Sequence, residues 1–279
     1  MKLIAIIFLI LIFTVVGFIG YKTNYFESFL TQNKKEIKKK IYINTQFFMT
    51  DADRALYAEL RENNPADMIL VSGEEYLANA GGDFAFANFI NVSTKNLPHY
   101  IAGFPRYIKK FNMVVSLDQA IQAFMYIKHK EKIKLESPKM FALLTYVKSI
   151  ANGEKININI KKDVELYEAY TLGKKTFHQK RGGRGLSCLS CHSKDILGSV
   201  LRTQPLPDLS AKGVAPAASW PAYRMTKSST RTLQRRFQGC MKNSLMTVIP
   251  LGSAEMVALE VYLTKKAIGA EIYIPGIKR

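Results

Sequence analysis

The sequence predicts an all-α protein in which an N-terminal apolar helix precedes two tandem helical domains. Three observations lead to this prediction: the second half of the chain repeats the first, apolar residues recur at helical spacing in both halves, and residues 3–20 form one uncharged apolar run. With 48% hydrophobic and 22% charged residues, the 279-residue chain can bury a core. It is neither a disordered tail nor a multi-span membrane protein.

The segment 1–20 is expected to be a signal peptide or a membrane anchor. Lys2 precedes an apolar run of 18 residues, which as a helix spans about 27 Å, close to the roughly 30 Å hydrocarbon core of a bilayer. No A-x-A cleavage pattern occurs around residues 17–21, which favours a retained anchor over a cleaved signal. Both alternatives predict an exported protein. A basic tail or linker follows at 21–57 and contains the lysine-rich stretch 34–40.

An internal repeat identifies the two domains. Segment 104–153 aligns with segment 220–269 at an offset of 116 residues, and segment 73–93 aligns with segment 173–193 at an offset of 100. The difference of 16 residues indicates one longer loop in the second copy, within 197–219. The two copies therefore predict the same structural unit.

Each unit is predicted to contain a helix near its Gly-rich start, a loop, a turn that opens with proline, and two further helices. One trio of apolar positions in each unit has the i, i+4, i+7 spacing of a single helical face. Residues 155–161 alternate instead, which is typical of an extended linker. We therefore place the domains at about 58–157 and 160–279. The two trios are Leu117, Ile121 and Phe124, and Leu233, Phe237 and Cys240.

The second unit contains Cys188-Leu189-Ser190-Cys191-His192, a CxxCH motif. Two cysteines at this spacing attach to both vinyl groups of a haem, and the adjacent imidazole binds the iron. A zinc site would need a second close pair of cysteine or histidine ligands, and the remaining candidates are scattered. The motif therefore predicts one covalently bound haem c, attached through Cys188 and Cys191, with His192 as a ligand of its iron. The scattered candidates are Cys240, His99, His129 and His178.

The first unit lacks every group that haem attachment requires. Its five aligned residues are Asn88-Phe89-Ile90-Asn91-Val92, and Phe124 takes the position of Cys240. Both units resemble small cytochrome c domains, so the first is expected to be a degenerate, haem-less copy retained for packing or docking. Upstream of the motif, a glycine-rich stretch at 182–185 would let the backbone turn close to the porphyrin, or form an ordinary flexible loop.

Cys240 is the third cysteine, and two roles are open for it. A free cysteine is often simply a buried apolar residue. Arg236, however, lies four residues earlier on the same helical face, and a neighbouring cation favours the thiolate that binds iron or attacks sulfur. Arg236 alone could equally belong to a solvated basic face. Three methionines are alternative sixth ligands of the iron, as in electron-carrying cytochromes: Met225, Met241 and Met246.

The charge of the chain bears on its location and partners. A formal charge of +18 would attract an anionic substrate, whereas the export signal and the haem motif exclude nucleic acid as a partner. The positive-inside rule would keep residues 34–40 in the cytoplasm. Because a c-type haem is expected outside the inner membrane, we interpret these lysines as a solvated tail, with weak attraction to anionic lipid as the alternative. We expect a periplasmic protein, tethered to the inner membrane if residues 3–20 are retained.

The second half is similar to the SoxA family of cytochrome subunits. The resemblance rests on the CxxCH motif, on Trp-Pro-Ala-Tyr-Arg at 220–224, on segment 233–240 with its Arg-Arg-x-x-Gly-Cys ending, and on segment 258–263. It covers about residues 60–279, strongly in the second half and weakly in the first. Some members of the family carry a second haem, which this sequence cannot attach.

The resemblance implies an activity and partners. The family starts periplasmic thiosulfate oxidation as an L-cysteine S-thiosulfotransferase: thiosulfate is coupled oxidatively to a cysteine of a SoxYZ-like sulfur carrier. Electrons leave through the haem to a small SoxX-like cytochrome c, the partner in a heterodimer. By resemblance, Cys240 is the distal haem ligand and the catalytic cysteine, carried as a persulfide, and Arg236 binds the substrate. The alternative is a membrane-tethered mono-haem cytochrome that only carries electrons, with His/Met ligation.

Overall fold

The computed structural model describes residues 49–201 and 204–278, so the predicted leader 1–20 and most of the tail 21–57 lie outside the described residues. In the described part of the chain no helix is long and apolar enough to cross a bilayer. The α-helices are α2 (Asp51–Glu62), α3 (Asp67–Ala78), α4 (Gly82–Phe89), α5 (Leu97–Ile101), α6 (Leu117–His129), α7 (Pro138–Ser149), α8 (Val164–His178), α9 (Cys188–Cys191), α10 (Leu233–Asn243) and α11 (Ala254–Lys266).

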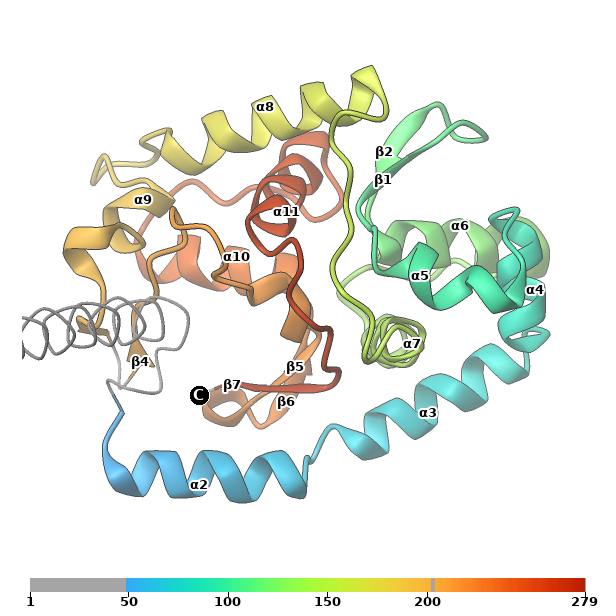
Figure 1. Ribbon diagram of the computed structural model, residues 1–279, viewed down its shortest axis with the longest axis horizontal. Coiled ribbons are helices and arrows are strands. Elements are labelled where there is room, and N and C mark those ends of the chain that lie inside the picture. The colour runs from blue at the N-terminus through green and yellow to red at the C-terminus, as the bar shows by residue number, and fades with distance from the viewer. Residues whose placement is uncertain (1–48, 202–203, 279) are drawn as a thin grey trace, which may run out of the picture. The chain divides into compact units, whose positions relative to one another are not determined.

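The described residues are mostly helical, as predicted, but they also form three small sheets that an all-α fold does not include (Figure 1). Each strand has only two or three residues, too few for an alternating apolar pattern to show in the sequence. The strands are β1 (Arg106–Ile108), β2 (Met113–Val115), β3 (Val200–Leu201), β4 (Gln204–Pro205), β5 (Ala222–Arg224), β6 (Ser229–Arg231) and β7 (Gly276–Lys278).

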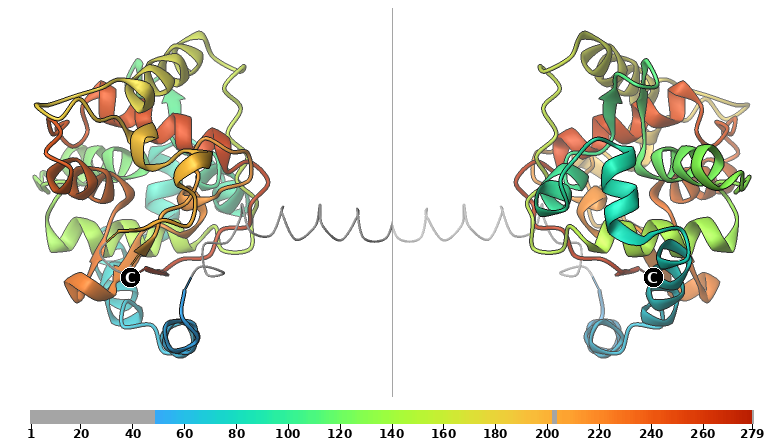
Figure 2. Two further views of the ribbon diagram at one scale, coloured as in Figure 1. Left: turned by 90° about the vertical axis from the view of Figure 1, so that its left-hand side faces the viewer. Right: turned by 90° about the vertical axis from the view of Figure 1, so that its right-hand side faces the viewer.

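The sequence repeat is visible as two equivalent helix pairs. Helix α3 crosses α7 in the first half, and α8 crosses α11 in the second (Figures 1 and 2). The helices approach most closely at Gly73 and Gly173, where a Cβ atom would overlap the backbone carbonyl group of Ala142 and of Ala258 respectively. Both glycines are therefore required by close packing, and the two sequence offsets describe the same helix crossing in each half.

The hairpin and helix that follow each proline turn are also equivalent. Hairpin β1–β2 precedes α6, and hairpin β5–β6 precedes α10, 116 residues later. At the start of α10, the Thr232 hydroxyl accepts a hydrogen bond from the Arg235 N–H at 3.3 Å. At the start of α6, the Ser116 N–H donates to Oε1 of Gln119 at 3.1 Å. Because such caps satisfy the free groups of a first helical turn, they set where each helix begins.

A continuous core joins the two halves, and Thr45–Arg279 form one compact unit. The predicted linker 155–161 is extended, and its isoleucines at 156, 158 and 160 are buried in this core. The connection therefore packs both halves together instead of holding them apart. A division into two domains at 58–157 and 160–279 stays a prediction.

The C-terminal strand β7 adds an element that the repeat did not predict. It pairs in parallel with β5, so that residues 222–224 lie beside residues 276–278. The Gly276 N–H donates to the carbonyl oxygen of Pro221 at 3.0 Å, and a Cβ atom on Gly276 would overlap the carbonyl oxygen of Ser219. This close packing brings the C-terminal end of the described chain to the edge of the second hairpin.

Candidate haem and substrate site

The attachment motif forms the short helix α9, Cys188–Cys191. Ser187 caps it: the Ser187 hydroxyl accepts from the Ser190 N–H at 3.3 Å, and the Ser187 N–H donates to the Ser190 hydroxyl at 3.0 Å. A capped turn holds residues three positions apart on one side of the helix. Cys188 and Cys191 are both free and partly buried. They thus have the arrangement that two bonds to one porphyrin edge require.

His192 follows α9 directly, and the long loop of the second half orients its ring. Nδ1 of His192 lies 2.9 Å from the carbonyl oxygen of Pro207. Since a carbonyl oxygen only accepts, Nδ1 carries the proton and Nε2 is left to bind a metal. Burial lowers the pKa of His192, which favours the neutral imidazole that binds metals. Two thiols and one oriented imidazole fit the requirements of a c-type haem.

The glycine-rich approach to the motif is a tight turn. Gly182 and Gly185 have φ values of 68° and 59°, in the left-handed region that favours glycine, and Arg181 pairs with Leu186 across the turn. A Cβ atom on Gly182 would lie 2.5 Å from the carbonyl oxygen of Leu245. The turn therefore packs the approach to α9 against the chain that leaves α10.

Cys240 of α10 comes close to the attachment motif. Burial raises the pKa of Cys188 to about 12 and also raises that of Cys191. In both cases the next cause is the charge of Cys240, an effect that acts only between neighbouring groups. Cys240 is itself free and only partly buried. The structure therefore brings all three cysteines of the chain together.

Two arginines belong to the same neighbourhood. Arg236 lies one turn before Cys240 on α10. Burial is the main cause that lowers the pKa of His192, and the positive charge of Arg236 lowers it further. Arg224 of β5, only 8% exposed, was not singled out from the sequence. Burial and the charge of Arg236 lower the pKa of Arg224 to about 10, whereas Cys240 raises it. Its signal in the sequence was its place at the end of the Trp-Pro-Ala-Tyr-Arg segment.

Two of the three methionines considered as iron ligands are packed in the core. Met241 and Met246 are core residues with 1% and 8% exposure, and Sδ of Met241 accepts a hydrogen bond from the Ile249 N–H at 3.5 Å. Successive residues on a helix point about 100° apart, so Met241 and Cys240 serve different faces of α10. Met225 is partly buried in the turn between β5 and β6.

Two phenylalanines of the first half take positions that correspond to the haem site of the second: Phe89 corresponds to Leu189 of the motif and Phe124 to Cys240. Phe124, the counterpart of Cys240, has its ring centroid 5.6 Å from that of Phe86 and 5.4 Å from that of Phe89. Phe111 lies 6.0 Å from Phe89. These are the separations of stabilising aromatic pairs. A packed aromatic cluster thus replaces the residues that would attach and bind a haem.

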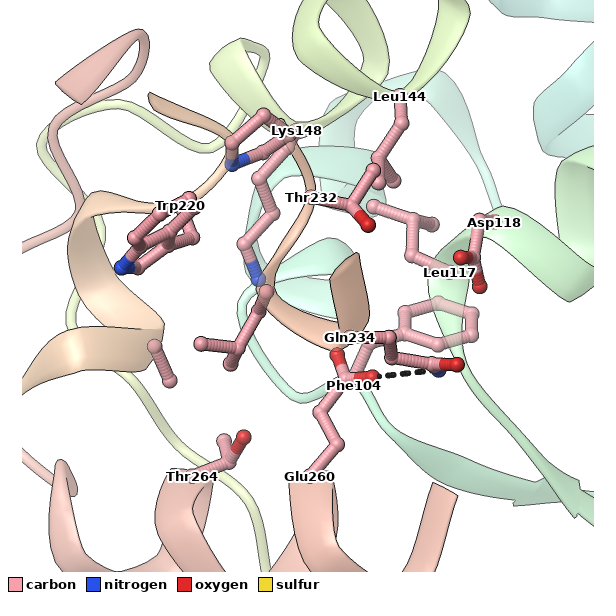
Figure 3. A pocket seen from close by; sticks show the side chains of 13 residues that line it. Phe104, Leu117, Asp118, Leu144, Lys148, Trp220, Thr232, Gln234, Glu260 and Thr264 are labelled. Atoms are coloured by element: carbon pink, nitrogen blue, oxygen red, sulfur yellow. Dashed lines mark hydrogen bonds between the residues drawn. The ribbon is translucent and has the colours of Figure 1, made fainter. Parts of the chain in front are cut away.

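A small cavity of about 30 Å³ lies between the two halves (Figure 3). None of the predicted haem or substrate residues lines it. Three ionisable residues do, namely Asp118, Lys148 and Glu260, and Nε2 of Gln234 donates to Oε2 of Glu260 at 2.8 Å. Most of the lining consists of counterparts at an offset of 116: Phe104 and Trp220, Leu117 and Leu233, Asp118 and Gln234, Leu144 and Glu260, and Lys148 and Thr264.

Burial dominates the titration of this cluster. It raises the pKa of Asp118 and raises that of Glu260 to about 7, with the charge of Asp118 adding to the rise at Glu260. The hydrogen bond from Gln234 and the charge of Lys148 oppose that rise. Burial also lowers the pKa of Lys148 to about 8. The cluster is a polar contact at the centre of the interface between the halves.

The mostly helical fold and the site, in which two thiols and an oriented imidazole lie together, are those that a c-type cytochrome with one covalently bound haem c requires. Within residues 49–201 and 204–278, no three His, Cys, Asp or Glu side chains gather to hold a bare metal ion. A haem iron would need fewer protein ligands, because the porphyrin supplies four nitrogen ligands, and the oriented imidazole of His192 could be one of them.

No family model matches the chain. It is 29% identical to the L-cysteine S-thiosulfotransferase subunit SoxA of Hydrogenophilus thermoluteolus, over 79% of this chain and 85% of that protein. The SoxA of Hydrogenobacter thermophilus is 27% identical, over 81% of this chain and 93% of that protein. The crystal structure of SoxXA from P. pantotrophus matches the fold with a TM-score of 0.66 and 21% identity, over 83% of this chain and 85% of that chain. The cytochrome that this chain resembles is SoxA, as predicted.

Proposed function

We propose that this chain is the thiosulfate-oxidising cytochrome subunit of an L-cysteine S-thiosulfotransferase. The observation that carries the proposal is that α10 brings Cys240 and Arg236 beside the haem-attachment motif on α9. The curated relatives that share its length support the same activity. A cytochrome that only carries electrons needs neither a cysteine nor a guanidinium at this point.

The residues of the site have distinct proposed roles. Cys188 and Cys191 would hold the haem covalently, and Nε2 of His192 and the sulfur of Cys240 would be the ligands of its iron. When bound, the haem supplies an acceptor of single electrons next to the sulfur chemistry. Arg236 binds the sulfonate of thiosulfate, because a guanidinium stays charged and offers forked donors to its oxygens.

The proposed reaction joins thiosulfate to a carrier protein. A sulfur–sulfur bond forms between a cysteine of the carrier and the outer sulfur of thiosulfate, and the S–H bond of that cysteine breaks. One proton and two electrons are released, so the coupling is an oxidation and requires an electron acceptor. Cys240, carried as a persulfide, is the proposed relay for sulfur, and the haem would be the acceptor of the electrons.

The proposal extends to organisation and partners. The haem-less half at 58–157 is a docking or packing domain, and the half at 160–279 carries the chemistry. We expect a SoxX-like cytochrome c as the partner in a heterodimer and a SoxYZ-like protein as the sulfur carrier. The location is the periplasm, with residues 3–20 as a tether to the inner membrane if they are retained.

The test uses the haem-loaded full chain together with a SoxX-like cytochrome and a SoxYZ-like carrier. The wild-type protein is expected to consume thiosulfate and to modify the carrier cysteine. Cys240→Ala should keep its covalent haem and lose turnover by on the order of 100-fold or more. Intact-mass measurement reports the haem, the state of the leader and any added sulfur on the Cys240 peptide in the same samples.

Two results would instead favour the electron carrier. One is the charge-transfer band of methionine–iron ligation in the oxidised wild-type protein. The other is a Cys240→Ala variant whose haem spectrum and thiosulfate turnover both match the wild type. Either would remove Cys240 from the site.

A further inference from the structure

Strand β7 delivers a lysine that neither the repeat nor the motif indicated. In the parallel pairing of β5 with β7, Lys278 lies directly beside Arg224. Neighbouring residues in register project to the same face of a sheet. The strand is held firmly, since Nδ2 of Asn64 donates to the carbonyl oxygen of Pro275 at 2.8 Å and Gly276 packs tightly against Ser219. The position of Lys278 is therefore set by the fold.

Lys278 lies in a concentration of positive charge. Burial lowers its pKa to about 8, and the further causes are the charges of Arg224, Arg236 and Arg61. In the part of the chain that the structure describes, no carboxylate lies within ion-pair distance of Lys278. With a pKa near 8 the ammonium is still mostly protonated at neutral pH. A partly buried cation without a carboxylate partner, next to other cations, attracts an anion.

Two of these cations, Arg224 and Arg236, lie near Cys240. Arg236 stands one helical turn before Cys240, and Arg224 interacts with both Arg236 and Cys240. Lys278 interacts with both arginines. Three elements that are distant in the sequence, β5, α10 and β7, therefore supply one group of cations, of which Arg224 and Arg236 lie near Cys240 and Lys278 lies beside Arg224.

We infer that Lys278 is a substrate-binding residue which, with Arg224 and Arg236, holds the sulfonate oxygens of thiosulfate while the outer sulfur faces Cys240. The inference rests on the proposed function and adds two residues to its site. Thiosulfate is a dianion with its oxygens at one end, so three cations on that end fix which sulfur meets the cysteine. The arrangement favours dianionic oxoanions of sulfur over monoanions of similar size.

The experiment compares the haem-loaded wild-type chain with Lys278→Gln, Lys278→Arg and Lys227→Gln. Lys227 is an exposed lysine in the turn of the same sheet, so its replacement removes the same net charge from a solvent-exposed side chain. We expect Lys278→Gln to weaken thiosulfate binding, measured by calorimetric titration, and to raise KM on the order of tenfold, with kcat and haem spectrum nearly unchanged. Lys278→Arg should recover most of the affinity, and Lys227→Gln should behave as the wild type.

Equal thiosulfate affinity in the wild type and Lys278→Gln would overturn the inference. So would a Lys278→Gln protein that loses haem or shifts its reduction potential while its KM stays the same, because the lysine would then serve the haem carboxylates. Failure of the proposed function looks different, since the wild-type complex itself would not turn thiosulfate over. The titration without partners decides the role of Lys278 even in that case.

Discussion

The orientation of His192 shows how much a single residue depends on atoms outside its motif. The CxxCH motif identifies the imidazole of His192 as a candidate ligand. The hydrogen bond to the carbonyl oxygen of Pro207 engages Nδ1 and leaves Nε2 available to a metal. That carbonyl lies in the extra loop of the second half, which the haem-less half lacks. Hydrogen bonds of this kind orient metal ligands, so the longer loop holds the proposed iron ligand in its orientation.

Arg236 is predicted to act on substrate binding. Arg236→Ala should raise KM for thiosulfate on the order of tenfold while covalent haem content stays the same, since a charge-assisted contact to the sulfonate is lost. Arg236→Lys should recover only part of the affinity for thiosulfate, because an ammonium group lacks the forked pair of donors that a guanidinium offers. Steady-state kinetics with the partner proteins provide the measurement. Lys242→Ala, on the exposed side of the same helix, is the control, and kinetics equal to it would exclude Arg236 from the site.

Glu260 is predicted to make stability depend on pH. Its pKa in the folded protein, about 7, exceeds its ordinary value of 4.5 because of burial and Asp118. Between these two pH values the folded state therefore binds more protons than the unfolded state. The free energy of unfolding should fall as pH rises from about 4.5 to 7. In Glu260→Gln, the decrease in the free energy of unfolding over this pH range should be smaller by about 2 to 3 kcal/mol.

Denaturant unfolding of the haem-loaded protein at pH 5, 6 and 7 measures this slope. Glu271→Gln removes an exposed carboxylate and serves as the control. Lys148 has a pKa lowered to about 8. It makes the free energy of unfolding rise with pH, but only above about pH 8. Equal slopes in the wild type and Glu260→Gln would show that the cavity cluster does not control the pH dependence.

At the scale of elements, the two halves are built on the same helix crossing. A glycine on α3 and another on α8 allow the backbones to meet where any side chain would overlap a carbonyl group. Caps at residues 116 and 232 then start equivalent helices. The elements differ where the halves differ in function: α9 carries the attachment cysteines, and β7 exists only in the second half.

Gly173→Ala should lower the free energy of unfolding by about 1 to 3 kcal/mol, because the new methyl group forces α8 away from α11. Gly183→Ala is a matched control, since a Cβ atom there meets no neighbour within 4 Å. Thermal and denaturant unfolding of both variants test the prediction. A Gly173→Ala variant as stable as Gly183→Ala would show that the helices adjust without cost.

At the scale of the whole molecule, one half contains the haem-attachment motif and the other is closed by aromatic packing. Both share a continuous core, so the haem-less half supports the half that carries the chemistry. Its interior is closed by the cluster of Phe86, Phe89, Phe111 and Phe124. The cluster explains how a cytochrome-like unit keeps its fold without attaching a porphyrin.

Phe124→Ala should leave a cavity in this cluster and cost about 3 to 5 kcal/mol of unfolding free energy. Tyr126→Ala, two residues later and 49% exposed, should cost less than about 1 kcal/mol. The covalent haem content per chain should be equal in both, since the attachment site lies in the other half. A loss of stability no greater than that of Tyr126→Ala would mean that the cluster does not hold the first half together.

The sequence by itself predicted the haem-attachment motif, because the chemistry requires two cysteines and a histidine within five residues of chain. It also determined the repeat, and with it the helix pairs, because both copies keep the same apolar spacing and the same glycine. It indicated Cys240 and Arg236 through a single helical turn. Local chemistry and helical period leave their mark in the order of residues.

Only the tertiary structure decided which distant residues meet. Arg224 and Lys278 come together through parallel strand pairing, and Asp118, Lys148 and Glu260 share a cavity between the halves. The three-residue strands are too short to show a period, and contacts across a core depend on how the helices pack. Residues that meet across a core or a sheet have no fixed spacing along the chain, so no sequence motif could predict these contacts.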